Sequence, residues 1–177
     1  MKPTAGLAAL VAAVLLASAC HPGREAANGG EAAGVKTVVA DKLFVSGGKI
    51  DMQLDGGAYE VRSAADNHIR VILTGNTENA KAEVTAGDRD ASLQVKDTPR
   101  NFRATIEVPA VADLVVHFKG GELVMEPITG NKDVQSYGGD IKIGIGNPDD
   151  YSSVDASVKV GEIDASAFGG SKSGLCV

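Results

Sequence analysis

Residues 138–146, GGDIKIGIG, have the glycine content of a phosphate-binding loop. Such a loop needs a set glycine spacing and a following helix whose N-terminal N–H groups face the phosphate. Here the next residues are NPDD, a turn with two negative charges, and no Lys-Ser/Thr pair follows. The sequence therefore does not predict nucleotide binding, and we interpret these glycines as the corners of a repeated backbone structure.

The remaining nucleophiles and histidines form no recognisable catalytic or metal-binding pattern. Residues 46–49, SGGK, match the SxxK form of penicillin-binding enzymes, but the companion motifs S-D-N and K-T-G are absent. The segment GGSKSG near the C-terminus lacks the G-x-S-x-G spacing of a nucleophile elbow. His21, His68 and His117 have no partner at a zinc-ligand spacing. We predict no catalytic residue, no cofactor-binding residue, no metal ligand and no cofactor.

Acidic residues recur at one place in three successive glycine-containing units, as Glu122, Asp140 and Glu162. If the units stack, these carboxylates form a column with about 4.8 Å between neighbours, where like charges repel unless cations or solvent screen them. The sequence leaves open whether this column binds Ca²⁺ or is simply solvated. Paired carboxylates also split glycosidic bonds, so a glycan-acting enzyme is one alternative, although the chain has no Trp and three Tyr for stacking against sugars.

Apolar alternation from residue 35 onward predicts an all-β domain. Ile50, Met52 and Leu54 alternate with polar residues, and the runs 102–108, 114–118 and 141–145 follow the same rule. Turn signals separate the runs, among them DGG at 55–57, TPRN at 98–101 and TGNK at 129–132.

Glycine-led units repeat along the chain: GGKIDMQL from Gly47, GGELVMEP from Gly120, GGDIKIGI from Gly138 and VGEIDASA from Val160. The last three begin 18 and 22 residues apart. A period near 20 is typical of a solenoid, in which each unit buries its apolar face on the next. We therefore predict a β-solenoid with coils of roughly 20 residues and with Gly121, Gly139 and Gly161 in one column. An antiparallel β-sandwich is the alternative.

We interpret residues 1–19 as an export signal that is not part of the folded domain. An apolar run at 7–16 is too short to span a bilayer, and small residues then lead to Cys20. This order resembles the lipobox of bacterial lipoproteins, which implies lipidation of Cys20, although Ala17 stands where Leu is usual. Simple cleavage after Ala19 is the alternative. His21 is not the Asp that marks inner-membrane retention in such lipoproteins, which favours the outer membrane.

We predict three segments: the signal at 1–19, the lipidated Cys20 with a flexible tether to residue 34, and one β-repeat domain at 35–177. The tether is rich in Gly, Ala and charges and has a root-mean-square reach of about 20 Å. If Cys20 carries lipid, Cys176 has no partner within the chain, and its pairing stays open. The formal charge of −6 and the absence of any basic run argue against nucleic acid as a partner.

The IEVP segment at 106–109, the successive units of glycine, acid and apolar residue, and the terminal GEI resemble the bacterial putative-adhesin β-repeat domain family. The resemblance covers about residues 69–175 and implies a non-enzymatic protein of the cell envelope. Similar proteins continue past the KSGL element with further strands, so a truncated C-terminus stays open. We expect an exported, lipid-anchored protein that acts in adhesion or surface interaction, with an unidentified envelope glycan or protein as partner. A soluble periplasmic binding module is a further alternative.

Overall fold

The computed structural model describes residues 37–147, 149 and 154–164, and this part is all-β as predicted. None of the described segments is a helix long and apolar enough to cross a membrane. The strands are β1 (Thr37–Leu43), β2 (Lys49–Leu54), β3 (Gly57–Ser63), β4 (His68–Gly75), β5 (Lys81–Ala86), β6 (Asp90–Lys96), β7 (Phe102–Val108), β8 (Asp113–Phe118), β9 (Gly121–Met125), β10 (Lys132–Ile143) and β11 (Val154–Asp164).

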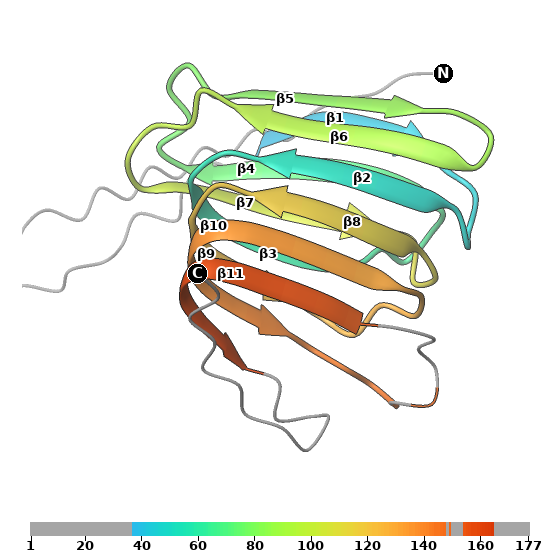
Figure 1. Ribbon diagram of the computed structural model, residues 1–177. Helices are drawn as coiled ribbons and strands as arrows, with labels where there is room; N and C mark the ends of the chain where they lie inside the picture. Colours follow the sequence, from blue (N-terminus) through green and yellow to red (C-terminus); the bar gives the residue numbers. More distant parts are fainter. Residues whose placement is uncertain (1–36, 148, 150–153, 165–177) are drawn as a thin grey trace, which may run out of the picture. The chain divides into compact units, whose positions relative to one another are not determined.

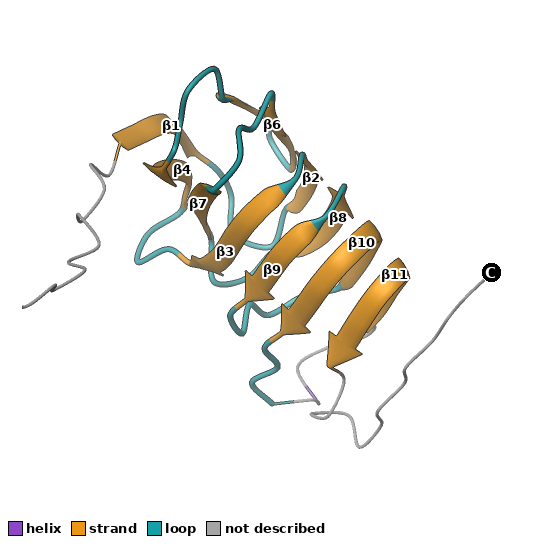
Figure 2. Ribbon diagram, turned by 90° about the vertical axis from the view of Figure 1, so that its left-hand side faces the viewer, coloured by secondary structure: helices purple, strands orange, loops and turns teal. Residues whose placement is uncertain are grey.

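The strands form a single mixed sheet in the order β1-β4-β7-β3-β9-β10-β8-β2-β6-β5, with β11 beside β10. β10 pairs with β8 through its first half and with β9 through its second half, so the sheet turns a corner along this strand. The sheet folds back on itself, and its end strands β1 and β5 come into contact (Figures 1 and 2). It thus nearly closes into a ring of strands.

The prediction of a β-solenoid with coils of roughly 20 residues is wrong for this domain, and so is the alternative of an antiparallel β-sandwich. In a solenoid each unit contacts only its neighbours in the chain. Here β4 is antiparallel to both β1 and β7, and β5 is antiparallel to β6. These pairs join the parallel ones in one sheet whose ends meet. Apolar alternation could not reveal this, because it reports which side chains face inward and not the direction of the adjacent strand.

Four glycines at the corner of the parallel part lie side by side on neighbouring strands, and we refer to Gly57, Gly121, Gly139 and Gly161 as the glycine column. Their φ angles are all positive, at 156°, 118°, 106° and 143° in chain order, a range that favours glycine. A Cβ on Gly139 would lie 2.2 Å from the carbonyl oxygen of Gly121. The predicted alignment of the last three is confirmed, and the glycines of GGDIKIGIG serve as corners.

The unit that begins at Gly47, which the sequence analysis grouped with the other three, is not in register with them. Lys49 pairs with Asp90 and with Asp113, half a unit away from the column. The corresponding corner of this part of the chain is instead Gly56-Gly57, where Gly57 pairs with Gly121.

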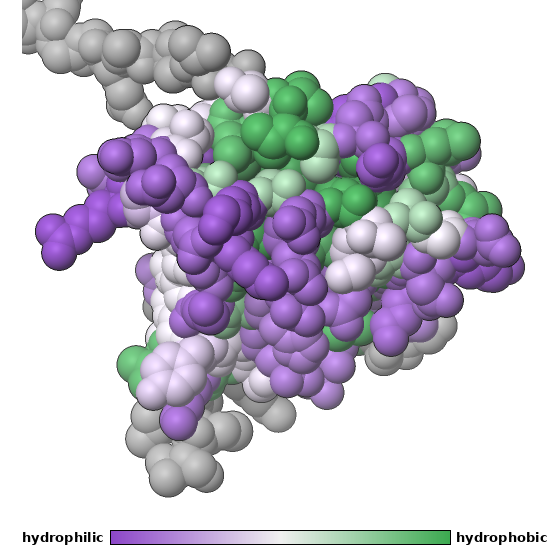
Figure 3. Space-filling model, turned by 90° about the horizontal axis from the view of Figure 1, so that it is seen from above, coloured by the Kyte–Doolittle hydropathy of each residue, from purple (hydrophilic) through white to green (hydrophobic). Residues whose placement is uncertain are grey.

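Alternating apolar side chains fill the interior of the folded sheet. On β7, Phe102, Ala104, Ile106 and Val108 are at most 3% exposed, as the alternation predicts. Apolar surface is also visible between polar side chains at the end where β1 and β5 lie (Figure 3). β1 itself carries exposed large apolar side chains.

Lys132 is a buried cation at the start of β10, although the sequence places it in a turn. It is 1% exposed, and its ammonium group donates hydrogen bonds to the backbone carbonyls of Ile128 and Gly130. Burial lowers the pKa of Lys132 from 10.5 to about 8, while the nearby Asp113 acts in the opposite direction. The aliphatic stem of Lys132 replaces an apolar side chain while its charge binds the 126–131 loop.

Candidate binding groove

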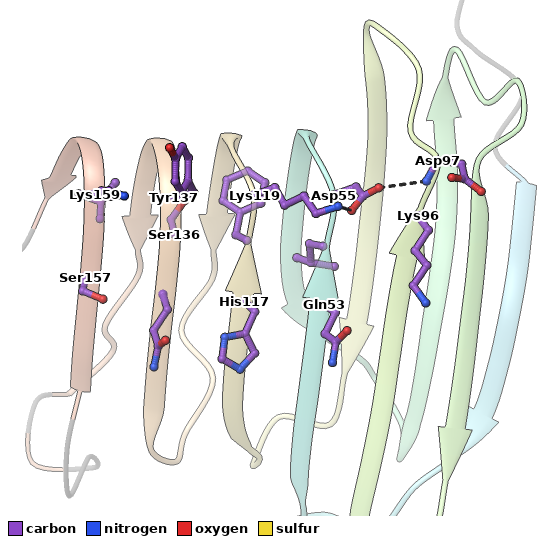
Figure 4. A pocket seen from close by; sticks show the side chains of 14 residues that line it. Gln53, Asp55, Lys96, Asp97, His117, Lys119, Ser136, Tyr137, Ser157 and Lys159 are labelled. Atoms are coloured by element: carbon purple, nitrogen blue, oxygen red, sulfur yellow. Dashed lines mark hydrogen bonds and ion pairs between the residues drawn. The ribbon is translucent and has the colours of Figure 1, made fainter.

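A groove of about 760 Å³ crosses five parallel strands, in the order β6, β2, β8, β10 and β11 (Figure 4). Its volume lies within the range of small-molecule sites, about 300–1,000 Å³. Because the strands are parallel and in register, equivalent residues of successive strands line the groove in rows.

The first row consists of one exposed polar side chain from each of four strands. Gln53 pairs with His117, His117 with Gln135, and Gln135 with Ser157. We refer to these four residues as the polar row. Each is exposed because its neighbours in the strand, such as Leu54, face the core. Adjacent members are spaced by the strand separation, about 4.8 Å.

The second row lies two residues further along each strand and consists, in spatial order, of Lys96, Asp55, Lys119, Tyr137 and Lys159. We refer to it as the lysine row. Backbone hydrogen bonds extend the ladder to this level, since Asp55 N donates to Val95 O at 3.0 Å and Lys119 N donates to Leu54 O at 2.9 Å. The row therefore places lysines on the first, third and fifth strands of the groove.

Two acids lie at the level of the lysine row, Asp55 and its neighbour Asp97, and each forms an ion pair with a lysine. The Lys119 ammonium lies 2.5 Å from Asp55, and the backbone N–H of Asp97 donates to Asp55 at 3.1 Å (Figure 4). Lys81 pairs with Asp97 at 2.7 Å, and this contact lowers the pKa of Asp97. Each acid thus has its own lysine.

The two end lysines of the row, Lys96 and Lys159, differ from Lys119 in their surroundings. The Lys159 ammonium lies 4.8 Å from the centre of the Tyr137 ring, a distance at which a cation is attracted to the ring face. Among the described residues, neither Lys96 nor Lys159 forms an ion pair. These two cations lie at opposite ends of the groove.

A third row, on the other side of the polar row, is acidic. Asp51 and Asp133 both pair with Val115, and Asp133 pairs with Asp155. Gln135 donates from Nε2 to Asp133 at 3.2 Å. This row thus combines acids from β2, β10 and β11 with Val115 from β8, and Asp51 is half-buried, with one carboxylate oxygen buried.

Among the described side chains of the groove, no nucleophile and base are in contact. His117 and Ser157 lie two strands apart, about 10 Å, too far for a hydrogen bond. Ser136 lies closer but is 8% exposed, and its hydroxyl donates to the carbonyl of Gly138 at 2.9 Å. The exposed amide, hydroxyl and imidazole groups of the polar row can each donate or accept hydrogen bonds.

The predicted acidic column is outside the groove, beyond the glycine corner. Asp140 pairs with Glu122 and with Glu162, so the three residues have the predicted register. Glu122 and Asp140 are exposed. Within the described residues no three His, Cys, Asp or Glu side chains gather closely enough to hold a metal ion.

The other candidates from the sequence lie elsewhere. His68 pairs with Asp41 at 2.6 Å, and Arg70 connects Asp41, Asp66 and Glu107 in one ion-pair network across β1, β4 and β7. The hydrogen bond from His68 lowers the pKa of Asp41. This network holds strands together, because each charge faces a partner.

Two of the sequence candidates are not among the described residues. Cys20, the predicted lipidation site, and Cys176 lie outside 37–147, 149 and 154–164. Of the three histidines, the groove contains His117, which the sequence analysis assigned no role.

The polar row and the lysine row were missed in the sequence, although a signal was present. When the units are aligned on the glycine column, the residues before it read QLDGG, HFKGG, QSYGG and SVKVG. The polar row is the first letter of each segment, and four of the five members of the lysine row are the third letter; the fifth, Lys96, lies in a segment without glycine. The sequence analysis aligned the units on the residues after the glycines, where the acidic column lies.

Solved structures of bacterial adhesion proteins are similar to this chain. A putative cell adhesion protein from Clostridium sporogenes is 13% identical, with a TM-score of 0.44, over 72% of this chain and 71% of that chain. A putative adhesin from Bacteroides fragilis is 17% identical, with a TM-score of 0.37, over 72% of this chain and 61% of that one. No family model and no curated protein matches. At these TM-scores the likeness carries no argument about a ligand.

Proposed function

We propose that this chain is a non-enzymatic interaction module of the bacterial cell envelope that binds its ligand in the groove across β6, β2, β8, β10 and β11. The observation that supports it is the polar row, four exposed hydrogen-bonding side chains in register on parallel strands. A repeated row suits a ligand that itself repeats, such as an envelope polymer.

Binding without turnover is favoured by the chemistry of the acids at the groove. A glycosidase needs one carboxylic acid that stays protonated, with a raised pKa, beside a second carboxylate. Asp55 and Asp97 are each paired with a lysine, and the pKa of Asp97 is lowered. Neither residue suits the role of the acid.

Display in the envelope is proposed from the sequence alone. The order of signal, small residues, Cys20 and tether supports export and lipid anchoring, with the outer membrane favoured. Lipid on Cys20 would leave the domain within a tether length of the membrane, where it meets envelope polymers.

A binding screen of the purified protein against envelope polysaccharides and peptidoglycan tests the proposal, with product analysis to detect turnover. The variant His117→Ala/Gln135→Ala removes the middle of the polar row and should weaken binding about tenfold or more. The control Glu83→Ala/Thr85→Ala removes two exposed polar side chains of β5, outside the groove, and should bind as the unmodified protein does. Equal affinity of the two variants, or release of shortened products, would overturn the proposal.

A further inference from the structure

Resting on the proposed function, we propose that the groove binds an uncharged linear glycan in an extended conformation, with one sugar for each strand that the glycan crosses. The charges in the middle of the groove are compensated within the protein. Lys119 and Asp55 neutralise each other at 2.5 Å (Figure 4), and Lys81 neutralises Asp97 at 2.7 Å. The middle strands of the groove therefore present no uncompensated charge to a ligand at the level of the lysine row.

The two lysines without an ion pair do not form a site for an anionic polymer. Lys96 on β6 and Lys159 on β11 are four strand separations apart, about 19 Å. This distance exceeds the Debye length of about 8 Å at physiological ionic strength, so the two cations do not act on one anionic group. Lys159 also lies over the Tyr137 ring. The pKa of Asp97 is lowered mainly by its hydrogen bond with Lys81, and Lys96 contributes to the same effect.

The polar row supplies neutral hydrogen-bonding groups at the spacing of an extended sugar chain. Its members come from successive strands, and one sugar of an extended chain is about as long as the strand separation, about 4.8 Å. Gln94 on β6 pairs with Gln53 and adds a further amide at the β6 end of the row. Successive sugars therefore meet successive side chains, which can exchange hydrogen bonds with sugar hydroxyls.

Tyr137 supplies apolar surface for a sugar ring. It lines the groove and is 67% exposed, so a large aromatic group faces water in the unbound protein. The faces of sugar rings carry C–H groups, which gain dispersion contacts against an aromatic ring. An aromatic ring beside a row of amides suits a ligand that combines hydroxyl groups with apolar ring faces.

An extended peptide suits the groove less well than a glycan. β2, β8 and β10 are each paired on both sides, so these strands offer no free edge to the N–H and C=O groups of a peptide. Side chains on one face of an extended peptide are about 6.6 Å apart, whereas the strands are separated by about 4.8 Å. A peptide that crossed the strands would therefore lose its alignment with the polar row.

Glycan fragments of matched length separate charge from shape, with affinity measured by calorimetry on the purified protein. Cellulose and chitin fragments are uncharged and extended, and at least one of them should bind. β-1,4-Glucuronan fragments have the cellulose backbone with a carboxylate on every sugar and should bind about tenfold more weakly than the better uncharged fragment. Malto-oligosaccharides have the composition of cellulose fragments but a curved chain, and they should be weaker by a similar factor.

Two further measurements test the register and the absence of charge recognition. Affinity for the better uncharged fragment should rise with length up to about five sugars, because the groove crosses five strands separated by about 4.8 Å, and should then level off. It should stay within about twofold when the salt concentration is raised to about 0.5 M. Full affinity for a disaccharide, or a tenfold loss in salt, would overturn the inference.

Variants locate the binding. Gln53→Ala/Gln135→Ala removes two amides of the polar row and should weaken binding of the uncharged fragment about tenfold or more. Tyr137→Ala should weaken it about fivefold. Glu122→Ala/Asp140→Ala is the matched control, because it removes two exposed polar side chains from paired strands outside the groove, and it should leave affinity unchanged.

The outcomes distinguish this inference from the proposed function. Tighter binding of glucuronan than of both uncharged fragments, or equal binding of curved and extended fragments, would overturn the inference. The proposed function would still hold if Gln53→Ala/Gln135→Ala weakened that binding. Binding of an uncharged Ser-Gln repeat peptide, with no binding of any glycan fragment, would identify a peptide as the ligand and overturn the inference. Binding that no groove variant affects would contradict the proposed function itself.

Discussion

Substituting Gly139 by Ala should destabilise the domain far more than the same change at Gly138, one residue earlier in β10. The φ of Gly139 is 106°, a conformation that costs a residue with a side chain about 1–3 kcal/mol. The new Cβ would also lie 2.2 Å from Gly121 O and 2.5 Å from Gly121 N. These atoms belong to the neighbouring backbone, so the strands must separate.

Forcing an extra carbon into such a packed site costs about 1–3 kcal/mol. The two effects together give about 2–6 kcal/mol, against a total stability of about 5–15 kcal/mol for a domain. At Gly138 a Cβ would lie 3.3 Å from Val160 O, and Val160 itself occupies the equivalent position on β11. Gly138 is not among the glycines with positive φ, and a contact of this length needs only a small shift of the neighbouring strand, so Gly138→Ala should cost less than about 1 kcal/mol.

Urea denaturation followed by circular dichroism measures both variants. A much lower midpoint for Gly139→Ala, with Gly138→Ala near the unmodified protein, is the expected result. Equal midpoints would refute the argument that the glycine column is required by close backbone contact.

Three further predictions concern the core, a buried charge and the anchor. Ile143→Asp should destabilise the domain by about 2–4 kcal/mol, because Ile143 packs against the core. Lys142→Asp, at an exposed position of the same strand, should be tolerated. Equal melting temperatures of the two variants would show that the inward and outward faces of β10 are assigned wrongly. The pKa of Lys132 is about 8 in the folded state and 10.5 when unfolded, so the unfolded state binds more protons between these pH values. The free energy of unfolding should therefore rise with pH in this range, by up to about 3 kcal/mol. Urea titrations at several pH values should show that Lys132→Met abolishes the rise, and an unchanged slope in this variant would contradict the prediction. Cys20→Ser should release the protein from the membrane fraction or leave the signal uncleaved, and fractionation identical to that of the unmodified protein would favour plain secretion.

The sequence predicted the local structure better than the arrangement of the strands. Alternation on β7 identified its buried residues, and the glycine spacing identified the stacked corners at Gly121, Gly139 and Gly161. The order and direction of strands were not predictable, because pairing such as β4 against both β1 and β7 depends on contacts between distant segments.

The burial of Lys132 was missed for a different reason. A lysine that follows Gly and Asn is typical of a turn. In the structure, however, the aliphatic stem of Lys132 points inward, and its ammonium group donates to the carbonyls of Ile128 and Gly130. The groove was missed because its members come from separate strands, and their alignment follows from register and not from spacing in one segment. Aligning the four units on the glycine column would have found the polar row and every member of the lysine row except Lys96.

The central claim, that the groove is the ligand-binding surface, is tested most directly by mapping backbone amide shifts of the labelled protein during titration with fragments of the envelope polysaccharide or peptidoglycan that binds in the screen. The account predicts progressive shifts at Gln53, His117, Gln135 and Lys159, which lie on four of the strands of the groove. Shifts confined to β1 and β5, or none at any ligand concentration that saturates binding in calorimetry, would contradict it.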